Sequence, residues 1–141
     1  MRPMTEAEAR DFLAHGTRTG KLATVRADGR PHVAPIWFVL DGGDLVFTTW
    51  HESVKARNLD RERRAALSVD LESPPFAFVV VEGPVTISED PGELLHFATR
   101  IGSRYMGTER AAEFGRRNAV DGEWLIRLGM TKLTGADDVS G

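Results

Sequence analysis

The stretch Gly20–Thr49, which reads GKLATVRADGRPHVAPIWFVLDGGDLVFTT, decides the fold. The dipeptide Asp28-Gly29 and the run DGGD at Asp41–Asp44 are both typical of tight turns between antiparallel strands. The strands predicted around these turns are Gly20–Arg26, His32–Leu40 and Leu45–Thr49. The stretch therefore predicts a three-stranded meander.

The second strand of this meander is apolar along most of its length. Its run VAPIWFVL, within His32–Leu40, offers apolar side chains to both faces of a sheet. Such strands are usually covered on both sides. We therefore expect one face of this strand to meet the protein core and the other face to meet a second body.

Three more strands are predicted after the meander. They are Ala65–Asp70, Phe76–Glu89 and Glu123–Leu133. Gly83-Pro84, inside the longest strand, indicates a bulge or a sharp bend such as a barrel corner. The small, polar tail Thr134–Gly141 is expected to fray.

Four helices are predicted from the residues at their starts. Thr5 and Glu8 have the spacing of a capping box. Asp90, Pro91 and Glu93 combine a cap, a first-turn proline and a capping acid. The predicted helices are Thr5–His15, Ser53 to about Asp60, Asp90 to about Met106, and Thr108 (as a cap) to about Asn118.

The order of these elements predicts a single domain over residues 1–141. Six antiparallel strands with few helices are typical of a closed or split β-barrel, so the fold class is mainly β with peripheral helices. Residues 1–18 form the N-terminal helical segment, and residues 134–141 are expected to be a flexible tail.

Composition excludes several classes of function. The chain has 141 residues and a net charge of -3, which argues against a general nucleic-acid surface. No apolar run has the length of a membrane span, and the N-terminus lacks a secretory signal. Cysteine is absent and the four histidines are scattered, so no disulfide, thiolate or metal site is predicted. We expect a cytoplasmic protein that binds neither nucleic acid nor membrane.

The segment Thr48–Leu59, TTWHESVKARNL, carries the most chemical information. Two threonines end a strand, and Lys55 lies in the first turn of the helix that follows. Hydroxyls, an ammonium group and a helix N-terminus together suit a phosphate group. The same cations, with those that follow in Arg61–Arg64, could instead form a solvated helix face. The residues alone leave both interpretations open.

Four segments of the sequence, taken together, resemble one superfamily. They are Gly20–Thr49 as quoted above, SVKARNLDRERRAALSVD (Ser53–Asp70), VVVEGPVTI (Val79–Ile87) and ATRIGSRYMG (Ala98–Gly107). In this order they resemble the split β-barrel flavin and deazaflavin oxidoreductases, the superfamily of pyridoxamine-phosphate oxidase, and in particular the short actinobacterial enzymes that use coenzyme F420. The resemblance implies a six-stranded antiparallel split barrel that forms a homodimer, with its cofactor in a groove between the two barrels.

The resemblance also implies which residues contact the cofactor. The implied contacts are Pro35, Ile36 and Trp37 along the ring system, Thr48 and Thr49 at phosphate or ribityl oxygens, and Lys55, Arg57 and Asn58 at the phosphate end. For Trp37, packing in the core or at a dimer interface is the alternative.

The chain departs from pyridoxamine-phosphate oxidases at two points. It ends in TKLTGADDVSG and not in their arginine-bearing segment, so that activity is not expected. Val54 precedes Lys55 where those oxidases carry an adjacent Arg-Lys pair. This single-lysine pattern is more similar to the deazaflavin branch, although it does not exclude FMN.

Three functions follow as hypotheses. The first is an oxidoreductase that uses reduced F420 for hydride transfer to an unsaturated organic substrate. The second is an FMN-binding oxidoreductase of the same fold, and the third is a carrier that binds the cofactor without turnover. No side chain is identified as catalytic, and solvent or Tyr105 are the candidates for a proton donor.

Overall fold

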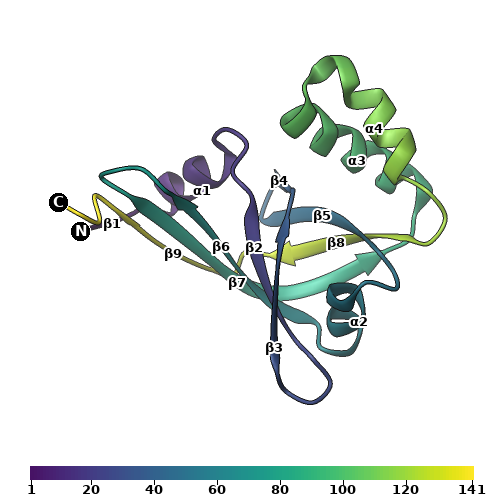
Figure 1. Ribbon diagram of the computed structural model, residues 1–141, viewed down its shortest axis with the longest axis horizontal. Helices are drawn as coiled ribbons and strands as arrows, with labels where there is room; N and C mark the ends of the chain where they lie inside the picture. Colours follow the sequence, from purple (N-terminus) through teal and green to yellow (C-terminus); the bar gives the residue numbers. More distant parts are fainter.

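The fold is an antiparallel β-sheet with helices at its periphery, seen in a computed structural model that describes residues 1–141 (Figure 1). The strands are β1 (Arg2–Pro3), β2 (Gly20–Val25), β3 (Pro31–Ile36), β4 (Val39–Asp41), β5 (Asp44–Trp50), β6 (Arg64–Leu71), β7 (Ala77–Ser88), β8 (Glu123–Gly129) and β9 (Lys132–Asp137). The helices are α1 (Glu6–Ala14), α2 (Val54–Arg61), α3 (Pro91–Met106) and α4 (Ala111–Asn118), with a 3-10 turn at Thr108–Arg110. The predicted mainly β class is confirmed.

The nine strands form one sheet, with the order β3-β2-β6-β7-β8-β5-β4 along its main path. Strand β9 lies off this path and pairs with β7 and β1. Every pairing is antiparallel. Because β3 and β4 end the path without pairing to each other, the sheet is open, as in a split barrel.

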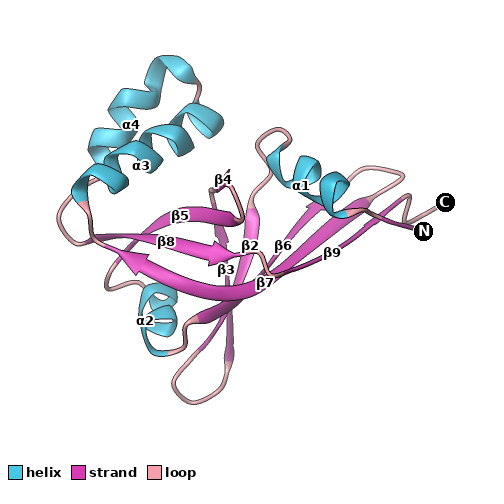
Figure 2. Cartoon of the chain, turned by 180° about the vertical axis from the view of Figure 1, so that it is seen from behind, coloured by secondary structure: helices cyan, strands magenta, loops and turns pink.

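The helices lie around the edges of the sheet. Figure 2 shows α3 and α4 side by side beyond β5 and β8, α1 beside β6 and β9, and α2 at the opposite end from α1. None of these helices is both long and apolar enough to cross a bilayer.

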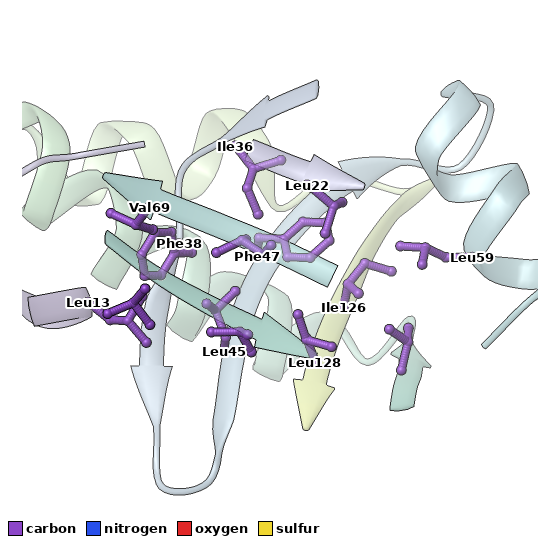
Figure 3. Close-up of a cluster of buried hydrophobic side chains, with 14 of the residues drawn as sticks. Leu13, Leu22, Ile36, Phe38, Leu45, Phe47, Leu59, Val69, Ile126 and Leu128 are labelled. Carbon is purple, nitrogen blue, oxygen red and sulfur yellow. The ribbon is translucent and has the colours of Figure 1, made fainter. Parts of the chain in front are cut away.

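The core is built from six strands of the sheet (β2, β3, β5, β6, β7 and β8) together with helices α1 and α2. Its main cluster has 15 buried apolar residues, several of which are drawn in Figure 3. Phe38 and Phe47 are its largest members, and both are fully buried. Full burial of a side chain of this size stabilises the fold by about 1.5–3 kcal/mol. The core therefore joins the β4–β5 hairpin to the rest of the sheet.

Three of the four predicted helix starts are confirmed in detail. Thr5 and Glu8 form the reciprocal capping box at α1, and the Asp90 carboxylate accepts from the Glu93 N–H at α3. The Ser53 hydroxyl accepts from the Ala56 N–H at α2. Each cap satisfies a backbone donor that the helix itself leaves without a partner.

The predicted start at Thr108 is wrong in its detail. Thr108 begins the 3-10 turn, and α4 follows Arg110 with no side-chain cap. Gly107, with a positive φ of 95°, ends α3 and turns the chain. The three residues that follow form i→i+3 hydrogen bonds before α4 begins.

The predicted strand His32–Leu40 is two strands, β3 and β4, separated at Trp37 and Phe38. β3 pairs with β2, whereas β4 pairs with β5, so the chain changes partner between them. The backbone of Phe38 bonds to side chains of α3 instead of to a neighbouring strand. The apolar run thus crosses from one half of the sheet to the other.

The predicted strand Glu123–Leu133 is likewise divided, at Met130-Thr131, into β8 and β9. Strand β9 continues to Asp137, so the first half of the tail expected to fray is paired with β7. Arg2 adds an ion pair to Asp137 at 2.8 Å. The six predicted strands thus become eight through these two divisions, and β1 is the ninth.

Gly83 and Pro84 mark a change of partner along β7 and not a bulge. The β6–β7 pairing runs through both residues without a register shift. On its other edge, β7 pairs with β9 up to Glu82 and with β8 from Val85. The two residues therefore lie where β7 passes from one half of the sheet to the other.

Gly83→Ala is expected to lower the free energy of unfolding by about 2 kcal/mol, because a Cβ at Gly83 would overlap the carbonyl oxygen of Gly129. Gly43→Ala is the matched control, because nothing lies within 4 Å of the Cβ position there. Urea denaturation of the two variants measures the difference. Equal midpoints for both variants would contradict this close approach of β7 and β8.

Candidate functional site

A groove of about 610 Å³ opens where β3, β5 and β8 face α2, α3 and α4. Its volume is within the usual range of small-molecule sites. Residues from six separate elements meet in it, so the groove exists only in the folded chain. It is lined by Thr19, Pro35, Ile36, Trp37, Thr48, Lys55, Ala98, Ile101, Phe114, Arg117, Asn118 and Glu123.

One end of the groove is apolar and aromatic. Pro35 and Ile36 end β3, and Trp37 follows at the β3–β4 break. The Trp37 ring stacks on Tyr105 with a centroid distance of 4.9 Å and lies 5.8 Å from the Phe114 ring. About a third of Trp37 is exposed (37%), so part of the indole is open to a ligand in the groove.

Two adjacent residues of α3 hold Trp37 and Phe38 in this position. Arg104 donates to the carbonyl oxygens of Phe38 at 2.7 Å, Leu13 at 2.8 Å and Gly16 at 2.9 Å. The Tyr105 hydroxyl accepts from the Phe38 N–H at 3.3 Å and donates to the Arg18 carbonyl oxygen at 3.0 Å. These bonds replace strand pairing at the break and fix the wall of the groove.

Burial shifts the pKa of both side chains. It raises the pKa of Tyr105 and lowers the pKa of Arg104, although the neighbouring tyrosine acts against the shift of the arginine. The Tyr105 hydroxyl is also committed to two backbone groups. The structure therefore favours a packing role for Tyr105 over the predicted candidate role of a proton donor.

The other end of the groove is polar. Thr48 comes from β5 and Lys55 from the first turn of α2. The Ser53 hydroxyl accepts from the Ala56 N–H. No backbone carbonyl accepts from the N–H groups of Val54 or Lys55. An ammonium group and free first-turn N–H groups are the donors that an anionic oxygen requires.

Glu123, the first residue of β8, is a functional candidate that sequence reasoning missed. Its carboxylate shares this end of the groove with Lys55. Burial raises its pKa, and the positive charge of Lys55 and the Thr48 hydroxyl act in the opposite direction. The polar end therefore contains charges of both signs.

Five of the eight predicted cofactor contacts line the groove, namely Pro35, Ile36, Trp37, Thr48 and Lys55. Thr49 is buried behind it, with its hydroxyl 2.8 Å from that of Ser53. Asn58 is also buried and donates to the Thr24 hydroxyl at 3.0 Å. Arg57 is exposed on α2 and does not line the groove. For these three residues, cofactor contact stays a prediction.

The basic run that ends α2 lies outside the groove. Arg61 donates to the carbonyl oxygen of Val25 at 2.6 Å. Arg63 and Arg64 line a separate depression of about 820 Å³, and each pairs with a nearby acid, at 2.9 Å and 2.6 Å respectively. Their charges are thus largely matched by their neighbours on the surface.

Comparison with known proteins decides the family. Residues 5–125 match the pyridoxamine 5′-phosphate oxidase family. The chain belongs to this family. The match covers both ends of the groove, including Lys55 and Glu123, and omits most of β8 and all of β9. Among proteins with curated functional descriptions, none matches the chain.

Solved structures place the chain among other split-barrel proteins of the pyridoxamine 5′-phosphate oxidase type. The conserved hypothetical protein Rv2991 from Mycobacterium tuberculosis is 27% identical, with a TM-score of 0.83, over 97% of this chain and 87% of that one. An F420 reductase is 29% identical, with a TM-score of 0.67, over 87% of this chain and 94% of that one. The heme storage protein HutZ from Vibrio cholerae, 23% identical with a TM-score of 0.71 and 94% coverage of each chain, shares the fold.

The remaining lining residues that were missed belong mainly to α3 and α4. Both helices were predicted, but the face that each presents to the sheet depends on how the pair packs. The two glycines at their contact, Gly102 and Gly115, leave no room for a Cβ against the opposite helix. One glycine in each predicted helix is therefore the sequence feature that could have indicated that α3 and α4 pack together. It does not indicate that the pair lines the groove.

Proposed function

We propose that this protein is an oxidoreductase that uses reduced coenzyme F420 to transfer a hydride to an unsaturated organic substrate. The observation that carries the proposal is the groove itself, with Trp37 and Ile36 at its apolar end and Lys55 at its polar end. An extended ligand with a planar ring and a phosphate matches this polarity. The 29% identity to an F420 reductase supports the choice of cofactor.

The residues present suit such a group. Pro35, Ile36 and Trp37 would hold the ring, and Thr48 and Lys55 would hold the phosphate through a hydroxyl and an ammonium group. When bound, F420 supplies a two-electron hydride donor. The chain's own task is to orient the ring and to keep water from it.

Helices α3 and α4 provide the cover for that task. Ala98 and Ile101 of α3 and Phe114 of α4 line the groove opposite the strands. These three apolar side chains lower the local dielectric and strengthen polar contacts in the groove, to which α4 also contributes Arg117 and Asn118. The reduced product also takes up a proton, which solvent would supply, because the Tyr105 hydroxyl is bonded to two backbone groups.

The second candidate is FMN in the same groove, favoured by the free first-turn N–H groups of α2, which suit a terminal phosphate. Fluorescence titration of the purified protein with F420 and with FMN separates the two. Tighter binding of F420 is expected. Tight binding of FMN with none of F420 would overturn the first proposal. Binding of F420 without oxidation of its reduced form by enones or quinones would indicate a carrier.

We also propose that the protein is a homodimer in which a second copy covers the β2–β3 hairpin. The outward face of this hairpin carries Ala23, Val25 and Val33, and Val33 is 68% exposed. Strand β3 is also an edge of the sheet. An exposed apolar face on an edge strand is a surface that association would bury.

Val33→Asp is expected to shift the protein from dimer to monomer, because the interface would have to bury an unpaired carboxylate. Light scattering at matched concentrations measures the mass. Val120→Asp, at another exposed valine outside the hairpin, is the control and should leave the mass unchanged. A wild-type protein that is monomeric, or a Val33→Asp variant that stays dimeric, would contradict this interface.

A further inference from the structure

A carboxylate lies at the end of the groove that the proposed function gives to a phosphate. Glu123 pairs with Trp50 in the β5–β8 ladder, and Thr48 lies two residues from Trp50 on the same face of β5. Side chains at such diagonal positions project to the same side of the sheet. Glu123 and Thr48 therefore face the groove together, beside Lys55.

The backbone before Glu123 fixes where its carboxylate lies. Gly122 has a positive φ of 94°, and its carbonyl oxygen accepts from the His51 N–H at 3.0 Å. The His51 ring nitrogen Nδ1 lies 2.8 Å from the same oxygen. The Trp50 ring packs against the Gly122 Cα so closely that a Cβ there would lie 2.6 Å from it. The turn that precedes Glu123 is therefore fixed by the hydrogen bonds of His51 and by the packing of Trp50.

The charge of Glu123 is not matched by a direct ion pair. Neither Glu123 nor Lys55 is within 4.0 Å of an opposite charge, so each leaves its electrostatic field in the groove. Arg117 of α4 adds a further positive charge to the lining. A site built only to attract anions would not place a half-buried carboxylate among these cations.

We propose that Glu123 is a specificity-determining residue, which biases this end of the groove toward a phosphodiester and against a phosphomonoester. The proposal rests on the proposed function, because it requires the phosphate of the cofactor to lie here. A diester carries one negative charge, whereas a monoester carries about 1.5–2 near neutral pH. Because Coulomb energy is proportional to charge, the carboxylate repels the monoester about 1.5–2 times as strongly. The phosphate of F420 is a diester and that of FMN is a monoester, so Glu123 favours F420.

A ligand series that differs only in this charge tests the proposal. The probes are riboflavin, FMN and the methyl ester of FMN, together with the matching deazaflavin alcohol, its 5′-phosphate and the methyl ester of that phosphate. Dissociation constants are measured by fluorescence titration for the wild type and for Glu123→Gln. The amide keeps the size of the side chain and removes its charge.

The expected result is a graded gain in affinity. Glu123→Gln should bind the monoesters about tenfold more tightly than the wild type and the methyl diesters about threefold more tightly, with no change for the uncharged alcohols. Glu52→Gln is the control, because Glu52 is exposed and does not line the groove although it carries the same charge. It should leave all the dissociation constants within about twofold of the wild type, as expected for a screened surface charge.

Two results would overturn the proposal while leaving cofactor binding intact. One is an equal gain for all three ligands of a series, which would mean that Glu123 acts through shape. The other is weaker monoester binding in Glu123→Gln, which would mean that the carboxyl supports the phosphate. If no ligand of either series binds the wild type or the variant, the proposed function fails and the role of Glu123 fails with it.

Discussion

Replacing Lys55 by alanine is expected to weaken F420 binding by about 1.5–3 kcal/mol, or roughly 10–150-fold in the dissociation constant. The ammonium group lines the polar end of the groove and makes no ion pair within 4.0 Å, although its charge acts on the nearby Glu123, so its donors are free for an anionic ligand. Fluorescence titration of the variant against the wild type measures the loss.

The fold of Lys55→Ala should be unaffected, because a partly exposed lysine without an ion pair contributes little to stability. Lys132→Ala is the matched control, since Lys132 is exposed on β9 and lies outside the groove. It should bind the cofactor as the wild type does. Equal affinities for Lys55→Ala and Lys132→Ala would remove the assignment of Lys55 to the phosphate.

Arg104→Ala is expected to lower the free energy of unfolding by about 3 kcal/mol. The guanidinium is half-buried and bonds to the carbonyl oxygens of Phe38, Leu13 and Gly16, which the substitution would leave without these donors. The same bonds hold the β3–β4 break, so Trp37 should also become more mobile. Urea denaturation and the fluorescence of the tryptophans measure the two effects.

Two further variants test whether the loss of stability comes from the Arg104 hydrogen bonds or from the loss of a positive charge. Arg104→Lys should recover only part of the stability, because an ammonium group cannot reach three carbonyl oxygens in the fixed geometry of a guanidinium. Arg116→Ala, at an exposed arginine of α4, should unfold at the wild-type midpoint. If Arg104→Ala were as stable as the wild type, the prediction would be wrong, because water would then satisfy the three carbonyl oxygens equally well.

The elements that sequence analysis predicted well are those with local signals. Thr5 with Glu8, Ser53, and Asp90 with Glu93 each place a helix start within a few residues, and the structure has all three caps. Asp28-Gly29 is the turn of a hairpin for the same reason, with Gly29 at a φ of 88°. Such features depend on neighbours along the chain and need no knowledge of packing.

The features that could not be predicted depend on residues far apart in sequence. The break at Phe38 is held by Arg104, 66 residues later, so the apolar run VAPIWFVL gives no sign of it. Strand β9 forms because β7 offers it an edge, which a small, polar tail does not indicate. In both cases, tertiary partners outweigh the local pattern.

The same distinction holds for the groove. Thr48 and Lys55 lie within one short segment, and their residue types by themselves suggest an anion site. Glu123 reaches them only through the register of β5 with β8. A single glutamate at the start of a predicted strand has no pattern of its own. The fold thus turns an anion site into one with mixed charge.

A crystal structure of the protein with F420 tests the central claim most directly. We predict that the phosphate lies within hydrogen-bonding distance of Lys55 Nζ and the Thr48 hydroxyl, with the deazaflavin ring along Pro35, Ile36 and Trp37. A cofactor bound elsewhere, or in the groove with its ring at Lys55 and its phosphate at Trp37, would contradict the claim.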